Sequence, residues 1–338
     1  MPNLLDPAIL FFAFGVLAGC IKSSLEIPPP ISRFLSLYLL MALGLKGGFA
    51  LAKSGLTTEV LSTLGLAIAL AVIIPMLGYR ILRRFLNGYD AAAIAATYGS
   101  VSAVTFITTI QYLENQGIAY GGHMAAAMAL MESPAIIMAV VFANALRQTQ
   151  PAHAAVAVGG GTLALGGAAG AGADRIPLGR ILHESFTDGA QLLLLGAMLI
   201  GVLSGEAGQA AMAPFSVDLF KGMLAFFLLD MGLMAARNLK DLRSASPWLL
   251  VYALGAPLLH AGLALGLSLV AGVSAGNGAL LMVLAASASY IAVPAVLRYA
   301  IPEARPALYF GLSLGLTFPF NILFGIPLHV GIAQRVLG

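Results

Sequence analysis

Two short runs of small and hydroxyl-bearing residues stand inside long apolar segments, and they are the residues in this chain best suited to hold a small ion. The first run is Gly99-Ser100-Val101-Ser102-Ala103-Val104-Thr105, and the second contains Ser287, Ser289 and Tyr290 ahead of Pro294. A helix interrupted at mid-membrane exposes backbone N–H groups at one half-helix start and carbonyl groups at another end, which suit an anion and a cation respectively. The alternative is that these small residues only ease helix packing. The residues expected to bind substrate are Gly99, Ser100, Ser102, Thr105, Ser287, Ser289 and Tyr290.

Three charged residues, Lys46, Glu132 and Asp230, are flanked by apolar residues on both sides. A charge inside a membrane is costly and therefore indicates function. Glu132 precedes Pro134, where a broken hydrogen-bond ladder lets the carboxylate face a cavity. We expect these three residues to serve ion coupling, with Lys46 and Asp230 paired across the molecule. A buried structural pair, or two side chains reaching toward the membrane surfaces, is the alternative.

The composition of the chain indicates that membrane-spanning helices position these residues. The chain has 338 residues, of which 60% are apolar and 9% charged, and its mean hydropathy is +0.95. Soluble domains carry roughly 25% charged residues, so a soluble protein is excluded. The net charge of +3 is better explained by basic residues that orient helices than by nucleic-acid binding, and the five histidines show no metal-ligand spacing.

Apolar runs of about 20 residues, the length that crosses the hydrocarbon core, recur along the chain. They predict ten spans, near residues 7–22, 32–52, 60–80, 91–112, 122–146, 187–204, 217–236, 247–272, 278–297 and 305–334. The first run, which lacks a basic flank and a cleavage signal, is expected to be a retained helix. With the N-terminus outside, thirteen Lys and Arg residues fall in inner loops and three in outer segments, so both termini are expected to face out. The Ala/Gly-rich segment 147–186 is expected to be a flexible cytoplasmic linker, with an eleventh or re-entrant span as the alternative.

The two halves of the chain resemble each other at offsets near 187 residues. An offset of 187 lays Ser100 and Ser102 over Ser287 and Ser289, and an offset of 185 lays Pro134 over Pro319. Five spans per half is an odd number, so the second half enters the membrane inverted relative to the first. The predicted fold is an all-α polytopic membrane protein, with two inverted five-helix repeats (1–146 and 187–338) and broken helices 4 and 9. This plan is typical of secondary transporters.

Several phrases in order resemble the SbtA-type sodium-dependent bicarbonate transporters. Leu43-Gly44-Leu45-Lys46-Gly47-Gly48 is similar to that family's Ile-Gly-Leu-Thr-Gly-Gly, and the run from Gly99 to Thr105 to its Gly-Ala-Val-Ser-Gly-Ser-Thr. Met131-Glu132-Ser133-Pro134-Ala135 is similar to Met-Asp-Ile-Pro-Ala, and Ala285-Ala286-Ser287-Ala288-Ser289 to the family's ninth-span region. The resemblance covers nearly all of both predicted repeats.

This resemblance implies uptake of bicarbonate with Na⁺ as coupling ion, both held where the fourth and ninth helices break. It implies a core domain of spans 3–5 and 8–10 against a gate domain of spans 1, 2, 6 and 7. It further implies a homotrimer in the inner membrane of a bacterium and control by a small cytoplasmic PII-like protein.

One position departs from the family. The family has an aspartate, used for sodium, where this chain has Tyr290, and a phenol does not replace a carboxylate as ligand of a hard cation. Lys46 or Glu132 is the candidate to supply the missing charge. Two transport functions therefore stay open: bicarbonate symport with Na⁺, and transport of another small organic or inorganic anion that is proton-coupled or independent of sodium. A sensor or scaffold that transports nothing is the third, whereas enzyme motifs such as H-E-x-x-H are absent.

Overall fold

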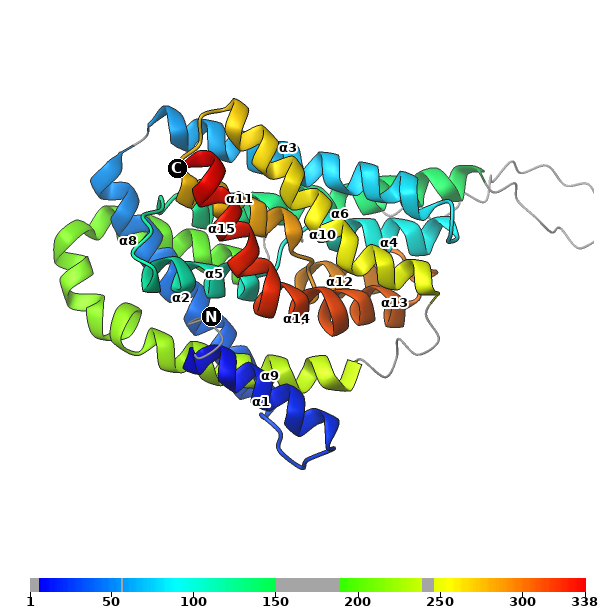
Figure 1. Cartoon of the computed structure of the whole chain (residues 1–338), viewed down its shortest axis with the longest axis horizontal. Coiled ribbons are helices and arrows are strands. Elements are labelled where there is room, and N and C mark those ends of the chain that lie inside the picture. The colour runs from blue at the N-terminus through cyan, green and yellow to red at the C-terminus, as the bar shows by residue number, and fades with distance from the viewer. Residues whose placement is uncertain (1–5, 56, 150–188, 239–245) are drawn as a thin grey trace, which may run out of the picture.

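The computed structural model describes residues 6–55, 57–149, 189–238 and 246–338, and these residues form helices and connecting turns without a strand. Figure 1 shows the helices gathered into a bundle, with α1 and α9 along its lower edge. The predicted all-helical architecture is therefore confirmed for the described part of the chain. Most of the predicted linker, residues 150–188, lies outside the described residues.

The first half of the chain begins with three helices and continues with a helix in two pieces. The Asp6 carboxylate caps the first helix by accepting a hydrogen bond from the N–H of Ala8, and Asn87 caps the fourth in the same way through the N–H of Asp90. The helices are α1 (Pro7–Cys20), α2 (Pro29–Ser54), α3 (Thr58–Leu82), α4 (Gly88–Gly99), α5 (Ala103–Asn115) and α6 (Met124–Thr149). Because α6 runs to Thr149, residues 147–149 of the predicted linker are helical.

The second half repeats a helix in two pieces and ends in a series of short helical segments. It contains three π-helical turns, one between α8 and α9 and two in the terminal series. Its elements are α8 (Gly189–Ala213), η2 (Pro214–Asp218), α9 (Phe220–Asn238), α10 (Pro247–Val270), α11 (Ala275–Ala286), α12 (Ala292–Ala300), α13 (Pro306–Phe310), η4 (Gly311–Thr317), α14 (Phe318–Phe320), η5 (Asn321–Gly325) and α15 (Ile326–Leu337). Such π-turns are often found at functional sites.

Within the described residues, seven helical segments are long and apolar enough to cross a membrane, which makes the chain a multi-pass membrane protein. Three features separate this number from the ten spans predicted from sequence. The first helix has only 14 residues, the predicted sixth and seventh spans form one helical segment at Leu192–Asn238, and the predicted ninth span is split between α11 and α12.

Two helix pairs come close enough for backbone to touch backbone. A Cβ atom on Gly48 of α2 would overlap the carbonyl oxygen of Met198 in α8 and would lie 2.9 Å from the Cα of Gly201. Likewise, a Cβ atom on Gly232 of α9 would overlap the carbonyl oxygen of Phe12 in α1. Small residues permit such approach where lipid removes the hydrophobic drive for association. The contacts join α1 to α9 and α2 to α8.

The first halves of the broken helices occupy the centre of the remaining bundle. Every residue of α4 from Asp90 to Gly99 is buried, as is every residue of α11 from Gly276 to Ala286. A helix that is apolar on all sides is stable only when other helices surround it. The chain therefore places the ends of α4 and α11, where the helices break, inside the protein and away from lipid.

We expect Gly48→Val to destabilise the protein, because the added side chain must displace the backbone of α8. Overpacking of this kind costs roughly 1–3 kcal/mol. Thermal unfolding of the detergent-solubilised chain, followed by size-exclusion chromatography, measures the loss. Gly196→Val on α8 is the matched control, since nothing lies within 4 Å of a Cβ at that position. Equal stability of the two variants would contradict the close contact.

Candidate functional site

Both predicted interruptions are present. The chain leaves helical geometry between Gly99 and Ala103, where Ser100 and Ser102 adopt extended backbone angles, and again between Ala286 and Ala292. Each interruption frees the carbonyl end of one short helix and the N–H end of the next. The predicted breaks in the fourth and ninth segments are therefore confirmed.

The two breaks are hydrogen-bonded to each other. The backbone N–H of Ser102 donates to the hydroxyl of Ser287 at 3.0 Å, and the backbone N–H of Ser289 donates to the carbonyl of Thr97 at 2.8 Å. The Ser287 hydroxyl also donates to the carbonyl of Leu284 at 2.8 Å. Segments nearly 190 residues apart in sequence are thus joined through backbone groups that an unbroken helix would have used itself.

A serine hydroxyl accepts a backbone N–H near the start of each second half-helix, with Ser102 as the N-cap of α5 and Ser289 two residues before Ile291, the N-cap of α12. The Ser102 hydroxyl accepts from the N–H of Thr105 at 3.2 Å and from its side-chain hydroxyl at 3.0 Å, and the Ser289 hydroxyl accepts from the N–H of Val293 at 3.3 Å. The N–H groups of the first turn of a helix have no carbonyl partner within the helix. The starts of α5 and α12 therefore present backbone donors and the positive ends of two helix dipoles.

Both helix starts face one cavity of about 70 Å³. A single water molecule needs roughly 10–15 Å³ on this measure, so the cavity has room for an ion of a few atoms. Residues from α2, α5, α6, α8 and the segment before α12 line it, and none of the described lining residues is Lys, Arg or His. The lining residues are Ser36, Leu40, Val101, Ser102, Ala103, Val104, Met128, Glu132, Ala190, Leu194, Ser289, Tyr290, Ile291 and Ala292.

Four of the residues expected from sequence meet at this cavity: Ser102, Ser289, Tyr290 and Glu132. The Tyr290 hydroxyl is buried beside the Ser102 hydroxyl and makes no hydrogen bond of normal geometry with a described residue. Its ring contacts Phe318, with 5.1 Å between ring centroids.

The other expected substrate ligands surround the cavity without lining it. The Thr105 hydroxyl donates to the Ser102 hydroxyl, and the Ser287 hydroxyl accepts the N–H of Ser102. The Ser100 hydroxyl is buried without a hydrogen-bond partner among the described residues. Gly99 packs on α3, because a Cβ there would lie 2.6 Å from the ring of Pro75. These four residues shape the breaks.

The predicted pairing of Lys46 with Asp230 is wrong. The Lys46 ammonium binds the Glu114 carboxylate at 2.8 Å, and the Asp230 carboxylate accepts a hydrogen bond from the Ser32 hydroxyl. Ser32 and Lys46 are 14 residues apart on α2, or about 21 Å along the helix, so one carboxylate does not reach both. Lys46 lines a different cavity, of about 180 Å³, together with Tyr120, and so does not supply charge to the cavity at the breaks.

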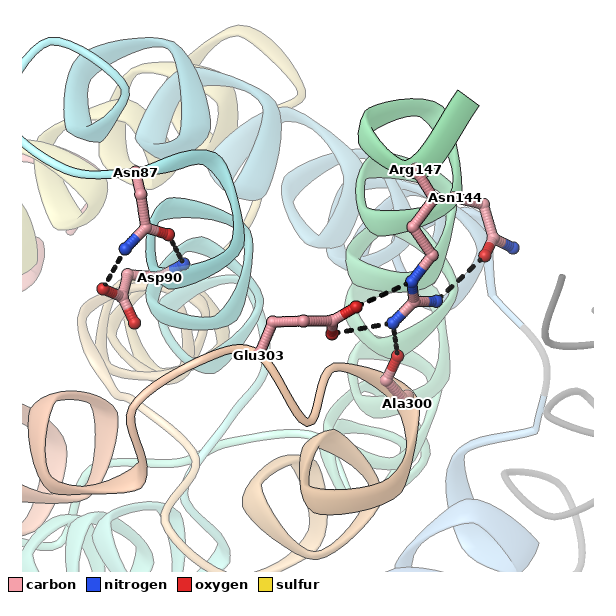
Figure 2. Close-up of polar contacts among 6 residues, drawn as sticks. All are labelled: Asn87, Asp90, Asn144, Arg147, Ala300 and Glu303. Carbon is pink, nitrogen blue, oxygen red and sulfur yellow. Dashed lines mark hydrogen bonds and ion pairs between the residues drawn. The ribbon is translucent and has the colours of Figure 1, made fainter. Parts of the chain in front are cut away.

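Sequence reasoning missed two ion pairs that bind the turn after α12 to the first half of the chain. Asp90 at the start of α4 is fully buried and binds the guanidinium of Arg305 at 2.8 Å and its backbone N–H at 2.8 Å. Figure 2 shows the neighbouring contact, in which Arg147 at the end of α6 reaches Glu303 at 2.8 Å and the carbonyl of Ala300 at 3.0 Å. The Asn87-x-x-Asp90 cap was a local signal for Asp90, whereas nothing local indicated its partner.

The turn before α11 is held in a comparable way at another end of the bundle. The Glu59 carboxylate accepts from the backbone N–H of Ser274 at 2.8 Å and from the amide of Asn277 at 2.9 Å. Asn277 in turn accepts from the backbone N–H of Gly121 at 2.7 Å. The start of each first half-helix thus carries a polar side chain that fixes a turn from the other half of the chain.

A family model of the Na⁺-dependent bicarbonate transporter superfamily matches residues 7–334. The chain belongs to this superfamily. The match confirms the resemblance read from the glycine and serine motifs, and it makes this superfamily member a transporter rather than an enzyme. No curated protein matches the chain.

The contact between Arg147 and Glu303 predicts a pH dependence of stability. Partial burial raises the pKa of Glu303, but hydrogen bonds and charge from Arg147 outweigh this and hold the pKa below its ordinary value. The stabilisation is therefore complete above the ordinary glutamate pKa of about 4.3 and is lost as the pH falls through the lowered pKa. Because Glu303 is partly exposed, we expect Glu303→Gln to lower the unfolding temperature by only about 1–2 °C at pH 7, and the gap to close below about pH 4.

Differential scanning fluorimetry of the solubilised chain between pH 3.5 and 7 tests this. Glu206→Gln is the control, since the Glu206 side chain is 86% exposed and lies 4.0 Å from Lys53. A gap between Glu303→Gln and the parent that widened on acidification would reverse the assigned sign.

Proposed function

We propose that this superfamily member carries bicarbonate across the membrane by alternating access and binds the anion in the cavity between its two broken helices. The observation that carries the proposal is that α5 and α12 both begin at this cavity. Each helix start is equivalent to roughly half a positive charge, and two such starts directed at one small volume favour an anion without any lysine or arginine. The family match supports bicarbonate as that anion.

The donors at the cavity suit a planar ion with three oxygen atoms. Ser102 and Ser289 lie at its wall together with Tyr290, whose buried hydroxyl makes no hydrogen bond of normal geometry within the described part of the chain. Hydrogen bonds to a charged group contribute roughly 1.5–3 kcal/mol each, so these three side chains would supply most of the selectivity for an oxyanion over chloride.

Two inverted repeats of five spans belong to the proposal. An offset of 187 residues lays Asp90 on Asn277 and Ser102 on Ser289, and each residue of a pair makes a corresponding contact. An offset of 188 lays Gly44 on Gly232, which exchanges the helix pair α2–α8 with α1–α9. The close contacts within these pairs support such a two-fold relation. Ten spans follow if α1 counts as one, α8 and α9 count as one each, and α11 and α12 together form one.

The mechanism that follows moves a core domain against a gate domain. The proposed core contains α3 to α6 and α10 to α15, and the proposed gate contains α1, α2, α8 and α9. Ser36 and Leu194 come from gate helices, whereas Ser102 and Ser289 come from the core, so the cavity lies on the boundary between the two. Sliding at this boundary would expose the anion to either side in turn. A homotrimer in a bacterial inner membrane, with both termini outside and a PII-like regulator, completes the proposal by family resemblance.

Glu132 favours a second form of coupling. Glu132 lines the same small cavity as the proposed anion site, so a cation bound or released at its carboxyl group would change the charge that the anion meets there. The coupling cation is either Na⁺, with Glu132 in place of the family's aspartate, or a proton on Glu132 itself. Tyr290 leaves fewer anionic ligands for Na⁺ and so favours the proton.

We expect Ser102→Ala and Ser289→Ala each to raise the KM for bicarbonate roughly tenfold or more, since each removes a proposed charge-assisted hydrogen bond to the anion and a hydroxyl that accepts a backbone N–H near a helix start. Uptake of radiolabelled bicarbonate into proteoliposomes measures the effect. Ser62→Ala is the control, because the Ser62 hydroxyl donates to the carbonyl of Thr58 within its own helix. Small and equal effects of all three substitutions would indicate that Ser102 and Ser289 serve helix packing and do not bind the anion.

Glu132→Gln is expected to abolish the dependence of uptake on the coupling gradient while leaving exchange of bicarbonate across the membrane measurable. Uptake driven separately by a Na⁺ gradient and by a pH gradient identifies the cation in the parent protein. Gradient-driven uptake that persists in Glu132→Gln would remove this residue from coupling, and an absence of any uptake in the parent would point to a sensor or scaffold.

A further inference from the structure

An apolar groove of about 420 Å³ runs between α3 and α10, on the outside of the bundle and apart from the cavity at the breaks. Several of its wall residues are exposed, among them Leu77, Phe85, Trp248 and Leu259. The full set is Leu77, Ile81, Leu82, Phe85, Trp248, Leu249, Val251, Tyr252, Gly255, Ala256, Leu259, His260 and Leu263. In a multi-pass membrane protein such a surface faces the acyl region of the bilayer.

The groove is somewhat longer than half of the hydrocarbon core of a bilayer. The rings of Phe85 and Trp248 stack at one end with 5.7 Å between centroids, and Leu263 lies at the other. The 15 residues from Trp248 to Leu263 extend about 22 Å along α10, and half of a hydrocarbon core is about 15 Å thick. An acyl chain of ordinary length therefore fits along the groove.

Positive charge gathers at the end marked by Phe85 and Trp248. Arg80 lies one helical turn beyond Leu77 on α3, and Arg84 directly precedes Phe85. Both arginines are exposed, and neither forms an ion pair with a residue that the structure describes. The N-terminus of α10, which begins at Pro247, adds the positive end of a helix dipole at the same place.

We propose that this groove is a binding site for an anionic phospholipid, with one acyl chain between α3 and α10 and the phosphate at Arg80, Arg84 and the first turn of α10. Charge complementarity selects this occupant. A second copy of the chain that docked through the same face would bring its own Arg80 and Arg84 against these, and like charges would oppose the contact. A lipid instead supplies the apolar length and the negative charge together.

The chain contains a single tryptophan, Trp248, and it lines the groove, so its fluorescence reports the occupant directly. The full chain is reconstituted in phosphatidylcholine vesicles in which a small fraction of lipid is brominated phosphatidylglycerol or, in parallel, brominated phosphatidylcholine. Bromine quenches tryptophan on contact. We expect brominated phosphatidylglycerol to quench at a roughly 25-fold lower mole fraction, since each of the two arginines near the phosphate contributes roughly a fivefold preference.

Two sets of variants separate the charge from the groove. Arg80→Gln with Arg84→Gln is expected to abolish the preference for phosphatidylglycerol while leaving quenching by both lipids. Gly255→Leu is expected to reduce quenching by both, because nothing lies within 4 Å of a Cβ there and the new side chain fills the groove without a clash. Gly65→Leu on α3, equally open and outside the groove, is the control and should change neither.

Equal quenching by the two brominated lipids in the parent would overturn the proposal. So would an absence of quenching by either lipid, since Trp248 would then be covered by protein, and so would a preference for phosphatidylglycerol that survives loss of both arginines.

Discussion

The structure depends on one constraint, which is that backbone N–H and C=O groups within a membrane must find partners inside the protein. Breaking two helices at the centre of the bundle releases such groups at four helix ends. Here the breaks satisfy one another, through the N–H of Ser102 on Ser287 and the N–H of Ser289 on Thr97. Burial of α4 and α11 on all sides keeps lipid away from the ends that remain. The non-helical backbone inside the bundle is therefore stable because each break supplies hydrogen-bond partners to the other.

The hydrogen bonds between the two breaks leave a cavity between the starts of α5 and α12. Serine hydroxyls accept the N–H of Thr105, the third residue of α5, and of Val293, the second residue of α12, while the first residue of each helix lines the space between them. The site therefore derives its positive character from backbone geometry rather than from a cationic side chain. Glu132 and Tyr290 then differ in kind from the serines, since they add a carboxyl and a phenol to a surface of backbone donors.

Much of this architecture was predictable because its signals are local. The uncharged run predicted at 60–80 is α3, Thr58–Leu82, and the glycine and serine runs marked both breaks within a few residues. Side-chain direction within the breaks was not predictable. Ser102 and Ser289 reach the cavity while Ser100 and Ser287 do not, and this depends on backbone angles that spacing alone does not define. The partners of Lys46, Asp90 and Arg147 were equally hidden, since each pair joins segments that only the tertiary fold brings together.

The turn after α12 is attached to two helices of the other half of the chain, to α4 through Arg305 and to α6 through Glu303 (Figure 2). Together with the bonds at the breaks, these attachments join both half-helix pairs to each other. If the proposed core moves, Ser102 and Ser289 move together, whereas Ser36 and Leu194 of the gate helices stay on the other side of the boundary. The conformational change would then be confined to the linkers and the glycine contacts at that boundary, and the distance between Ser102 and Ser289 would stay the same.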